Sequence, residues 1–381
     1  MTQPQPQAQT RIGRLPGPVR AILVVAFLYL FLGGVKLLET GIKGLGSDLT
    51  DALFENVTNP LAGLSVGVLA TVLVQSSSVT TATIVGLVAA GVVDVPTAVP
   101  MIMGANIGTT VTNTIVAVTH IRHSDEFRRA FTAATMHDFF NVIAVAILLP
   151  IELLTGFLSN AAEEIALFIS GGQELGGSFD SPVKGAVSWF AGQVESLFEV
   201  FTKNETALAV LAIVFGIVVV YVALTLITKN MKVLVADRIE RSLNAALARS
   251  GLVGMAVGTI VTIAVQSSSI TTSILIPLCA SGILLVRNAY PITLGANVGT
   301  TVTALIAALG AGAISGLTIA VTHTLFNIAG ILLIYPWSKT RYVPVAMAER
   351  LADLAIRRKT LALLYLVGAF VVVPLLIIVI L

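Results

Sequence analysis

The segments VQSSSVTT (residues 74–81) and VQSSSITT (residues 265–272) are two copies of one polar motif in a hydrophobic chain. The similarity extends outward from the motif. Residues 66–118 align with residues 257–309 without a gap, at a constant offset of 191, and 26 of the 53 aligned positions are identical. The pattern indicates an internal duplication, so we expect two structurally related halves.

The composition places this duplication in a membrane. Of the 381 residues, 56% are hydrophobic and only 11% are charged, which leaves too little polar surface for a soluble protein. Apolar stretches at 20–38, 206–228 and 360–381 are long enough to cross a bilayer as helices. We therefore expect an all-α polytopic membrane protein. The net charge of +2 does not suggest nucleic acid as a partner, and the lone Cys279 excludes an internal disulfide.

The two motifs interrupt their own hydrophobic segments. Residues 60–92 and 251–284 each contain two apolar stretches hinged at Gln-Ser-Ser-Ser, and each stretch is too short for a full crossing. They favour re-entrant or broken-helix hairpins, whose freed backbone groups must line a cavity. The amphipathic stretches 39–58 and 231–248 occupy equivalent places and are expected along opposite membrane surfaces.

Charge in the connecting segments predicts the orientation. Basic residues outnumber acidic ones by three to none in 1–20, five to two in 229–250 and six to two in 337–359, which places these segments in the cytoplasm. Segment 155–205 has two basic and seven acidic residues and is compatible with the outside. The copies are then entered by helices of opposite direction. The sequence therefore predicts two inverted-topology repeats, an arrangement typical of transporters.

This interpretation divides the chain into five parts. They are a disordered cytoplasmic tail (1–19), repeat 1 (20–154), an extracytoplasmic linker (155–205), repeat 2 (206–336), and a cytoplasmic amphipathic segment with a terminal transmembrane helix (337–381).

Clustered hydroxyl groups at membrane depth indicate a binding site. A single membrane serine most often bonds to its own helix. Here a Gln and three serines occur twice, each time followed 29 residues after the Gln by Gly-Ala-Asn-x-Gly-Thr-Thr. Because buried polar groups cost free energy unless they are satisfied, the duplication favours a polar substrate over simple helix packing.

The aligned windows contain only two charged residues, Asp94 and Arg287, so no fixed cation is expected in the core. An anion would then be held by hydroxyls, Gln and Asn amides and helix N-termini, with sodium ions offsetting its charge. Binding of the two would be mutually favourable. Asp138, within the apolar stretch 131–150, is a functional candidate; the alternative is a helix-end carboxylate wetted by the loop at 121–129. His137 and His323 are expected to hydrogen-bond between helices.

Both QSSS tetrads, GANIGTTVTNTIVA (104–117), FRRAF (127–131), HDFFN (137–141) and GANVGTTVTALIA (295–307) resemble the type II sodium-dependent phosphate cotransporters and their bacterial relatives. The resemblance covers most of residues 20–380. It implies sodium-coupled import of inorganic phosphate by alternating access, with phosphate and sodium between the QSSS regions near the bilayer midplane.

The resemblance also implies roles for particular residues. Candidate substrate-binding residues are Gln75, Ser76, Ser77, Ser78, Asn106, Thr110, Gln266, Ser267, Ser268, Ser269, Asn297 and Thr301. Candidate sodium ligands are Gln266, Ser267, Ser268, Thr109, Asp138 and Asn141. Family members with Asp in the HDFFN-like segment resemble electrogenic transporters, so electrogenic transport is expected.

Two departures from the family pattern stand out. Animal members have a long disulfide-bonded loop between the repeats, whereas residues 155–205 are short and lack cysteine, which favours a bacterial inner-membrane protein. Animal members often carry an acidic residue where this chain has His123, so the composition of one sodium site differs.

Other readings remain open at this point. A hydroxyl-rich pocket also suits another small oxyanion or a carboxylate. An intramembrane serine hydrolase is disfavoured because no G-x-S-x-G element is present, and a passive channel is disfavoured by the broken helices. No phosphate-loop spacing indicates a nucleotide, and no cofactor is expected beyond co-transported sodium. The lipid bilayer is the expected surrounding, and an oligomer is compatible with the sequence.

Overall fold

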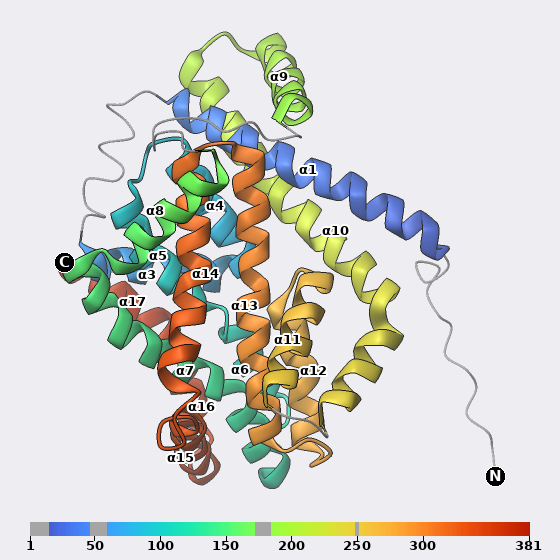
Figure 1. Ribbon diagram of the computed structural model, residues 1–381, viewed down its shortest axis with the longest axis vertical. Coiled ribbons are helices and arrows are strands. Elements are labelled where there is room, and N and C mark those ends of the chain that lie inside the picture. Colours follow the sequence, from blue (N-terminus) through green and yellow to red (C-terminus); the bar gives the residue numbers. More distant parts are fainter. Residues whose placement is uncertain (1–14, 46–58, 172–183, 248–250) are drawn as a thin grey trace.

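The computed structural model describes residues 15–45, 59–171, 184–247 and 251–381 (Figure 1). Every secondary-structure element within these ranges is a helix. Residues 1–14 of the predicted disordered tail lie outside the described residues, and residues 17–19 already belong to the first helix, which begins at Gly17.

Seven helical stretches in the described part of the chain are long and apolar enough to cross a membrane. They are α1 (Gly17–Lys43), α5 with α6 (Val95–Gly108 and Val111–Val118), α7 (Ser124–Thr155), α10 (Glu205–Leu247), α13 (Val286–Ala311), α14 (Ile314–Ile334), and the C-terminal run of α16, η3 and α17 (Thr360–Val367, Gly368–Val372 and Val373–Ile380). The all-α polytopic expectation is confirmed. The three apolar stretches identified first are among the seven.

Four shorter apolar helices form at the duplicated motif. They are α3 (Pro60–Val74), α4 (Ser77–Ala89), α11 (Gly251–Val265) and α12 (Ser268–Ala280). Each pair is separated only by the Gln-Ser that begins the motif. The helices therefore break at the expected hinge, while the re-entrant path and the inversion of the repeats stay predictions.

Close backbone packing of the same kind occurs in both copies. A Cβ atom on Gly67 of α3 would collide with the carbonyl oxygen of Met101 on α5, and one on Gly258 of α11 would collide with that of Ile292 on α13. Small residues let membrane helices approach this closely, because association there depends on packing rather than on the hydrophobic effect. Each broken helix is thus fixed against a neighbouring helix.

Helix α10 is longer than the sequence analysis expected. The predicted span at 206–228 and the predicted surface segment at 231–248 form one helix that extends to Leu247. The chain has neither glycine nor proline from 217 to 250, so nothing in the sequence ends the helix at the membrane surface. In the first copy α1 runs to Lys43, and residues 46–58 of the equivalent segment lie outside the described residues.

The three remaining helices in the described ranges lie in the segments predicted to be outside the repeats. The predicted linker at 155–205 contains α8 (Phe157–Ile169) and α9 (Lys184–Phe201), and α15 (Val343–Arg357) precedes the C-terminal run. Figure 1 shows α9 at one end of the long axis and α15 at the other. The charge-based topology requires these two helices on opposite sides of the membrane.

Candidate functional site

Each motif begins with a glutamine in the left-handed backbone conformation. Gln75 has φ 55° and Gln266 has φ 57°, and they are the only non-glycine residues with positive φ in the described ranges. The conformation costs an L-residue roughly 1–2 kcal/mol. The side chains offset this cost, because Nε2 of Gln75 donates to the Val72 carbonyl at 2.6 Å and Nε2 of Gln266 donates to the Ile263 carbonyl at 2.7 Å. Each glutamine thus satisfies a carbonyl that the helix end leaves free.

The other end of each glutamine amide is also occupied. Oε1 of Gln75 accepts a hydrogen bond from Thr112 of α6 at 3.2 Å, and Oε1 of Gln266 accepts one from Thr303 of α13 at 3.0 Å. The glutamines therefore tie each helix break to a neighbouring helix. Holding the shape of the break is their observed role.

The first serine of each motif starts the next helix. Ser76 and Ser267 are in extended conformation and cap α4 and α12, where their hydroxyl oxygens accept from the N–H groups of Val79 and Ile270, each at 3.4 Å. An N-capping serine leaves the other first-turn N–H groups without intrahelical partners. The helix dipole adds partial positive charge at the same place. Both motifs therefore offer the features of an anion site.

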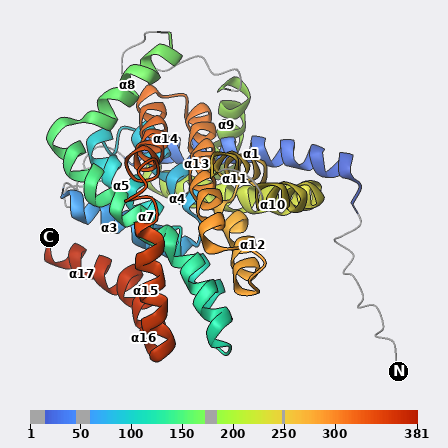
Figure 2. The same cartoon turned by 60° about the horizontal axis from the view of Figure 1, so that its bottom comes forward.

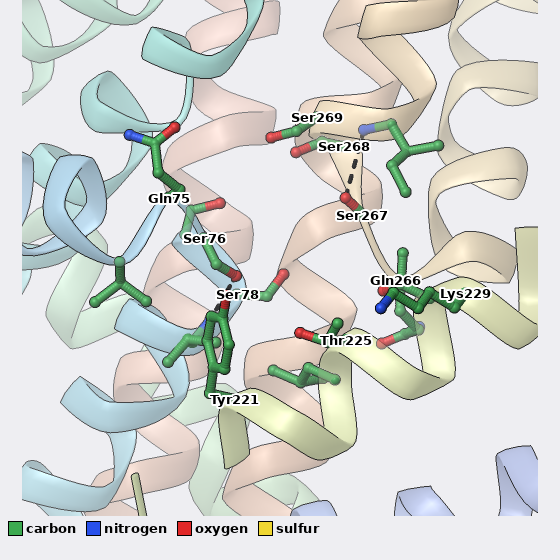
Figure 3. A pocket seen from close by; sticks show the side chains of 16 residues that line it. Gln75, Ser76, Ser78, Tyr221, Thr225, Lys229, Gln266, Ser267, Ser268 and Ser269 are labelled. Carbon is green, nitrogen blue, oxygen red and sulfur yellow. Dashed lines mark hydrogen bonds between the residues drawn. The ribbon is translucent and has the colours of Figure 1, made fainter. Parts of the chain in front are cut away.

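A cavity of about 260 Å³ lies between the two motifs. All eight residues of Gln75–Ser78 and Gln266–Ser269 line it. Figure 3 shows the two motifs on opposite sides, with α10 along a third side. The volume greatly exceeds the roughly 10–15 Å³ that one water molecule needs. Two segments 191 positions apart in sequence thus form one polar pocket.

Four serine hydroxyls in this pocket are free for a ligand. Ser77 and Ser268 are only 6% and 3% exposed, and Ser78 and Ser269 are buried and half-buried. Within the described part of the chain, none of these hydroxyls has a hydrogen-bond partner, whereas most other buried hydroxyls bond to a carbonyl of their own helix. A hydroxyl that lines a cavity and has no protein partner can donate its proton to a bound ligand. The arrangement supplies donors for an anion.

Helix α10 adds four residues that the sequence analysis did not identify. Tyr221, Thr225, Thr228 and Lys229 complete the polar lining. Lys229 adds a fixed cation to the cavity lining, and because its side chain is exposed it lies outside the core, where none was expected. The expectation considered only the aligned repeat windows, and α10 lies outside them. In the sequence, the α10 residues could have been found from their spacing of three to four residues, which places polar side chains on one helix face.

The asparagines that follow each motif occupy a separate buried cluster. Nδ2 of Asn297 donates to Oδ1 of Asn141 at 3.0 Å and to Oδ1 of Asn327 at 2.6 Å. Nδ2 of Asn141 donates to the carbonyl of Asn106 at 2.8 Å, and Nε2 of His323 lies 3.3 Å from Oδ1 of Asn106. None of the five lines the cavity between the motifs. The helices α5, α7, α13 and α14 meet through this cluster.

The predicted threonines lie outside the cavity lining as well. The hydroxyls of Thr109, Thr110 and Thr301 donate to carbonyl oxygens three or four positions earlier at 2.8–2.9 Å. A hydroxyl whose proton is used in this way still offers lone pairs to a cation but no proton to an anion. Their geometry therefore suits sodium better than phosphate.

Asp138 is buried in the interior of α7. It is 1% exposed, which excludes the alternative of a loop-wetted carboxylate at a helix end. Oδ2 accepts a hydrogen bond from the hydroxyl of Tyr365 at 2.8 Å, and Oδ1 has no partner among the described residues. Asn141 lies one helical turn further along α7. No group of three His, Cys, Asp or Glu side chains that could hold a metal occurs in the described ranges.

The FRRAF segment contacts both α12 and α15. Nε of Arg129 donates to the carbonyls of Cys279 and Ala280 at 3.1 and 2.8 Å, where α12 ends. The neighbouring Arg128 forms a two-point ion pair with Asp353 of α15, with a shortest distance of 2.6 Å. Arg129 thus caps the helix whose other end lies at the cavity.

Comparison with known proteins identifies relatives of this chain. The profile of the Na+/Pi-cotransporter family matches residues 30–170 and 219–341. The sodium-dependent phosphate transport protein 2A of Rattus norvegicus is 33% identical over 442 aligned residues, which cover 98% of this chain and 69% of the rat protein. Protein 2B of Homo sapiens is 32% identical and is matched over 93% of this chain and 64% of its own length. No solved structure matches the chain significantly.

Proposed function

The chain belongs to the Na+/Pi-cotransporter family, and from this premise we propose that it imports inorganic phosphate together with sodium ions. Phosphate binds in the cavity between the two Gln-Ser-Ser-Ser motifs. The observation that carries the proposal is that both motifs, with the N-termini of α4 and α12, line one cavity.

The chemistry of the lining suits phosphate. A phosphate ion is mainly a hydrogen-bond acceptor, and the cavity offers free serine hydroxyls, first-turn N–H groups and the Lys229 ammonium. In the described ranges no carboxylate lines the cavity. The partial positive charges of two helix N-termini act on the ion from opposite sides.

Sodium uses a different set of atoms. Asp138 of α7 supplies a buried carboxylate with one oxygen free of partners. Neutral oxygens come from Asn141, one turn further along α7, and from Thr109 and Thr110 between α5 and α6. Hard cations prefer such oxygens. Coupling follows because each bound ion reduces the electrostatic cost of binding the other, and this effect is reciprocal. The inverted repeats supply the two alternately open states.

The residues that line the cavity favour a transporter over an intramembrane serine hydrolase. Neither His137 nor His323 lines the cavity, so its serines have no histidine beside them to act as a general base. The short, cysteine-free segment 155–205 supports a bacterial inner membrane as the location of this multi-pass protein.

Uptake of radioactive phosphate into proteoliposomes tests the proposal. An inward sodium gradient should drive accumulation, and replacing sodium by potassium should abolish it. Competition by arsenate, sulfate and succinate at fixed sodium measures selectivity; inhibition by arsenate alone is expected. Stronger competition by sulfate or succinate than by unlabelled phosphate would instead assign the cavity to another oxyanion or to a carboxylate.

A further inference from the structure

The carboxylate of Asp138 is held by a helix that belongs to neither repeat. Tyr365 lies on α16, and its hydroxyl donates to Oδ2 at 2.8 Å. Oδ1 is buried and has no partner in the described part of the chain. The two oxygens of one carboxylate are therefore unequal: one is fixed by the protein and the other is available.

Aromatic packing fixes the position of the tyrosine ring. Its centroid lies 6.3 Å from that of Phe131, 6.4 Å from that of Phe139 and 5.9 Å from that of Phe370. Phe131 and Phe139 belong to α7, the helix of Asp138 itself. Such contacts stabilise a defined ring orientation, so the hydroxyl is directed at the carboxylate by rigid surroundings.

A π-helical turn follows α16 along the chain and packs against α3, the first half of the first broken helix. The turn, η3, spans Gly368–Val372, and its Phe370 is 1% exposed and packs against Val68 of α3 and Val111 of α6. Figure 2 shows the C-terminal run passing beside α3. Single π-turns inside α-helices occur often at functional sites. The C-terminal run thus contacts the Asp138 region and the helix that leads to the first motif.

The second repeat lacks the carboxylate of this contact. The position equivalent to Asp138, at the offset of 186 that relates His137 to His323, is Thr324, and its hydroxyl donates to the Ala320 carbonyl of its own helix at 3.2 Å. The carboxylate that Tyr365 contacts therefore has no carboxylate equivalent in the second repeat.

We propose that Tyr365 is a positioning residue for sodium: by holding Oδ2 of Asp138, it orients Oδ1 as the sodium-binding oxygen. This inference rests on the proposed function. Without the hydroxyl, the carboxylate must be ordered by the ion itself, so sodium binds more weakly. Phosphate, which binds between the serine motifs, is affected only through coupling.

Sodium titrations of phosphate uptake test this role. We compare wild type, Tyr365→Phe, Asp138→Asn and the double variant in proteoliposomes, with Tyr29→Phe as the matched control because its hydroxyl bonds to the distant Ala186 carbonyl. Tyr365→Phe keeps the ring contacts. It should raise the half-saturating sodium concentration about three- to tenfold, as expected when a positioning effect equal to one typical hydrogen bond is lost. Half-saturating phosphate at saturating sodium should change less than twofold.

The double variant distinguishes positioning from packing. If Tyr365 acts through the carboxylate, adding Tyr365→Phe to Asp138→Asn should raise half-saturating sodium no further. Sodium-induced thermal stabilisation of the detergent-purified proteins gives the same ranking without transport. A Tyr365→Phe variant with wild-type sodium dependence, or an equal rise in both backgrounds, would overturn the role of Tyr365 alone. Sodium-independent uptake by the wild type would instead overturn the proposed function.

Discussion

Replacing Ser77 or Ser268 by alanine should weaken phosphate binding while leaving the free energy of unfolding nearly unchanged. Ser77 and Ser268 are 6% and 3% exposed, and their hydroxyls bond to no described residue. A hydrogen bond to a charged group contributes about 1.5–3 kcal/mol, so Ser77→Ala or Ser268→Ala should raise half-saturating phosphate by about 10- to 150-fold. No internal hydrogen bond is lost, so the free energy of unfolding should change by less than about 0.5 kcal/mol.

The assay combines phosphate titration in proteoliposomes with thermal unfolding of the sodium-free protein. Ser315→Ala is the control, because that hydroxyl donates to the Val88 carbonyl at 3.2 Å and lies outside the cavity. The control should keep wild-type phosphate affinity. Wild-type affinity in both Ser77→Ala and Ser268→Ala would refute the placement of phosphate between the motifs, and a large loss of thermal stability would refute the argument that these hydroxyls are free.

Three further predictions follow from charge and topology. Lys229→Gln should raise the half-saturating phosphate concentration about two- to fivefold, and more at low ionic strength, because an exposed cation attracts the anion through screened electrostatics. Lys229→Arg should keep the wild-type value. The same half-saturating concentration for Lys229→Gln and wild type at all salt concentrations would contradict this. Cysteines placed at Ser188 and Asn244 in a cysteine-free background should react with impermeant reagents from opposite sides of the membrane, and labelling from one side would disprove the inverted topology. An inside-negative potential should accelerate uptake by wild type and not by Asp138→Gly, since moving one charge through 100 mV contributes about 2.3 kcal/mol; a voltage-insensitive wild type would exclude electrogenic transport.

The sequence predicts the helix breaks well because their cause is local. A glutamine followed by three serines ends one hydrophobic run and caps the next, and α4 and α12 begin at Ser77 and Ser268 as this chemistry requires. The length of α10 follows from the absence of glycine and proline from 217 to 250, and hydropathy alone does not report where a helix ends. The expected end near 228 was wrong because polarity marks a membrane surface without ending a helix.

The site was harder to predict because residues that follow the serines at a constant spacing need not line the same cavity as the serines. Asn106 and Asn297 follow the serines at a constant spacing in both copies, yet they point into the asparagine cluster between helices. Their direction depends on helix rotation, which is set by the glycine contacts of α5 and α13. Lys229 was missed for the opposite reason: it is distant from both motifs in sequence, and only the packing of α10 brings it to the cavity.

The symmetry of the cavity and the asymmetry of the charge have different consequences for the proposed mechanism. Equivalent serines from both repeats line the phosphate cavity, so an exchange of conformation between the halves regenerates the same anion site in the opposite state. A ligand with equal affinity for both states cannot shift their balance. Asp138 has no carboxylate counterpart, because Thr324 occupies the equivalent position. The surroundings of the sodium site therefore differ between the two states, and this difference supplies the state-dependent affinity that the symmetric phosphate cavity lacks.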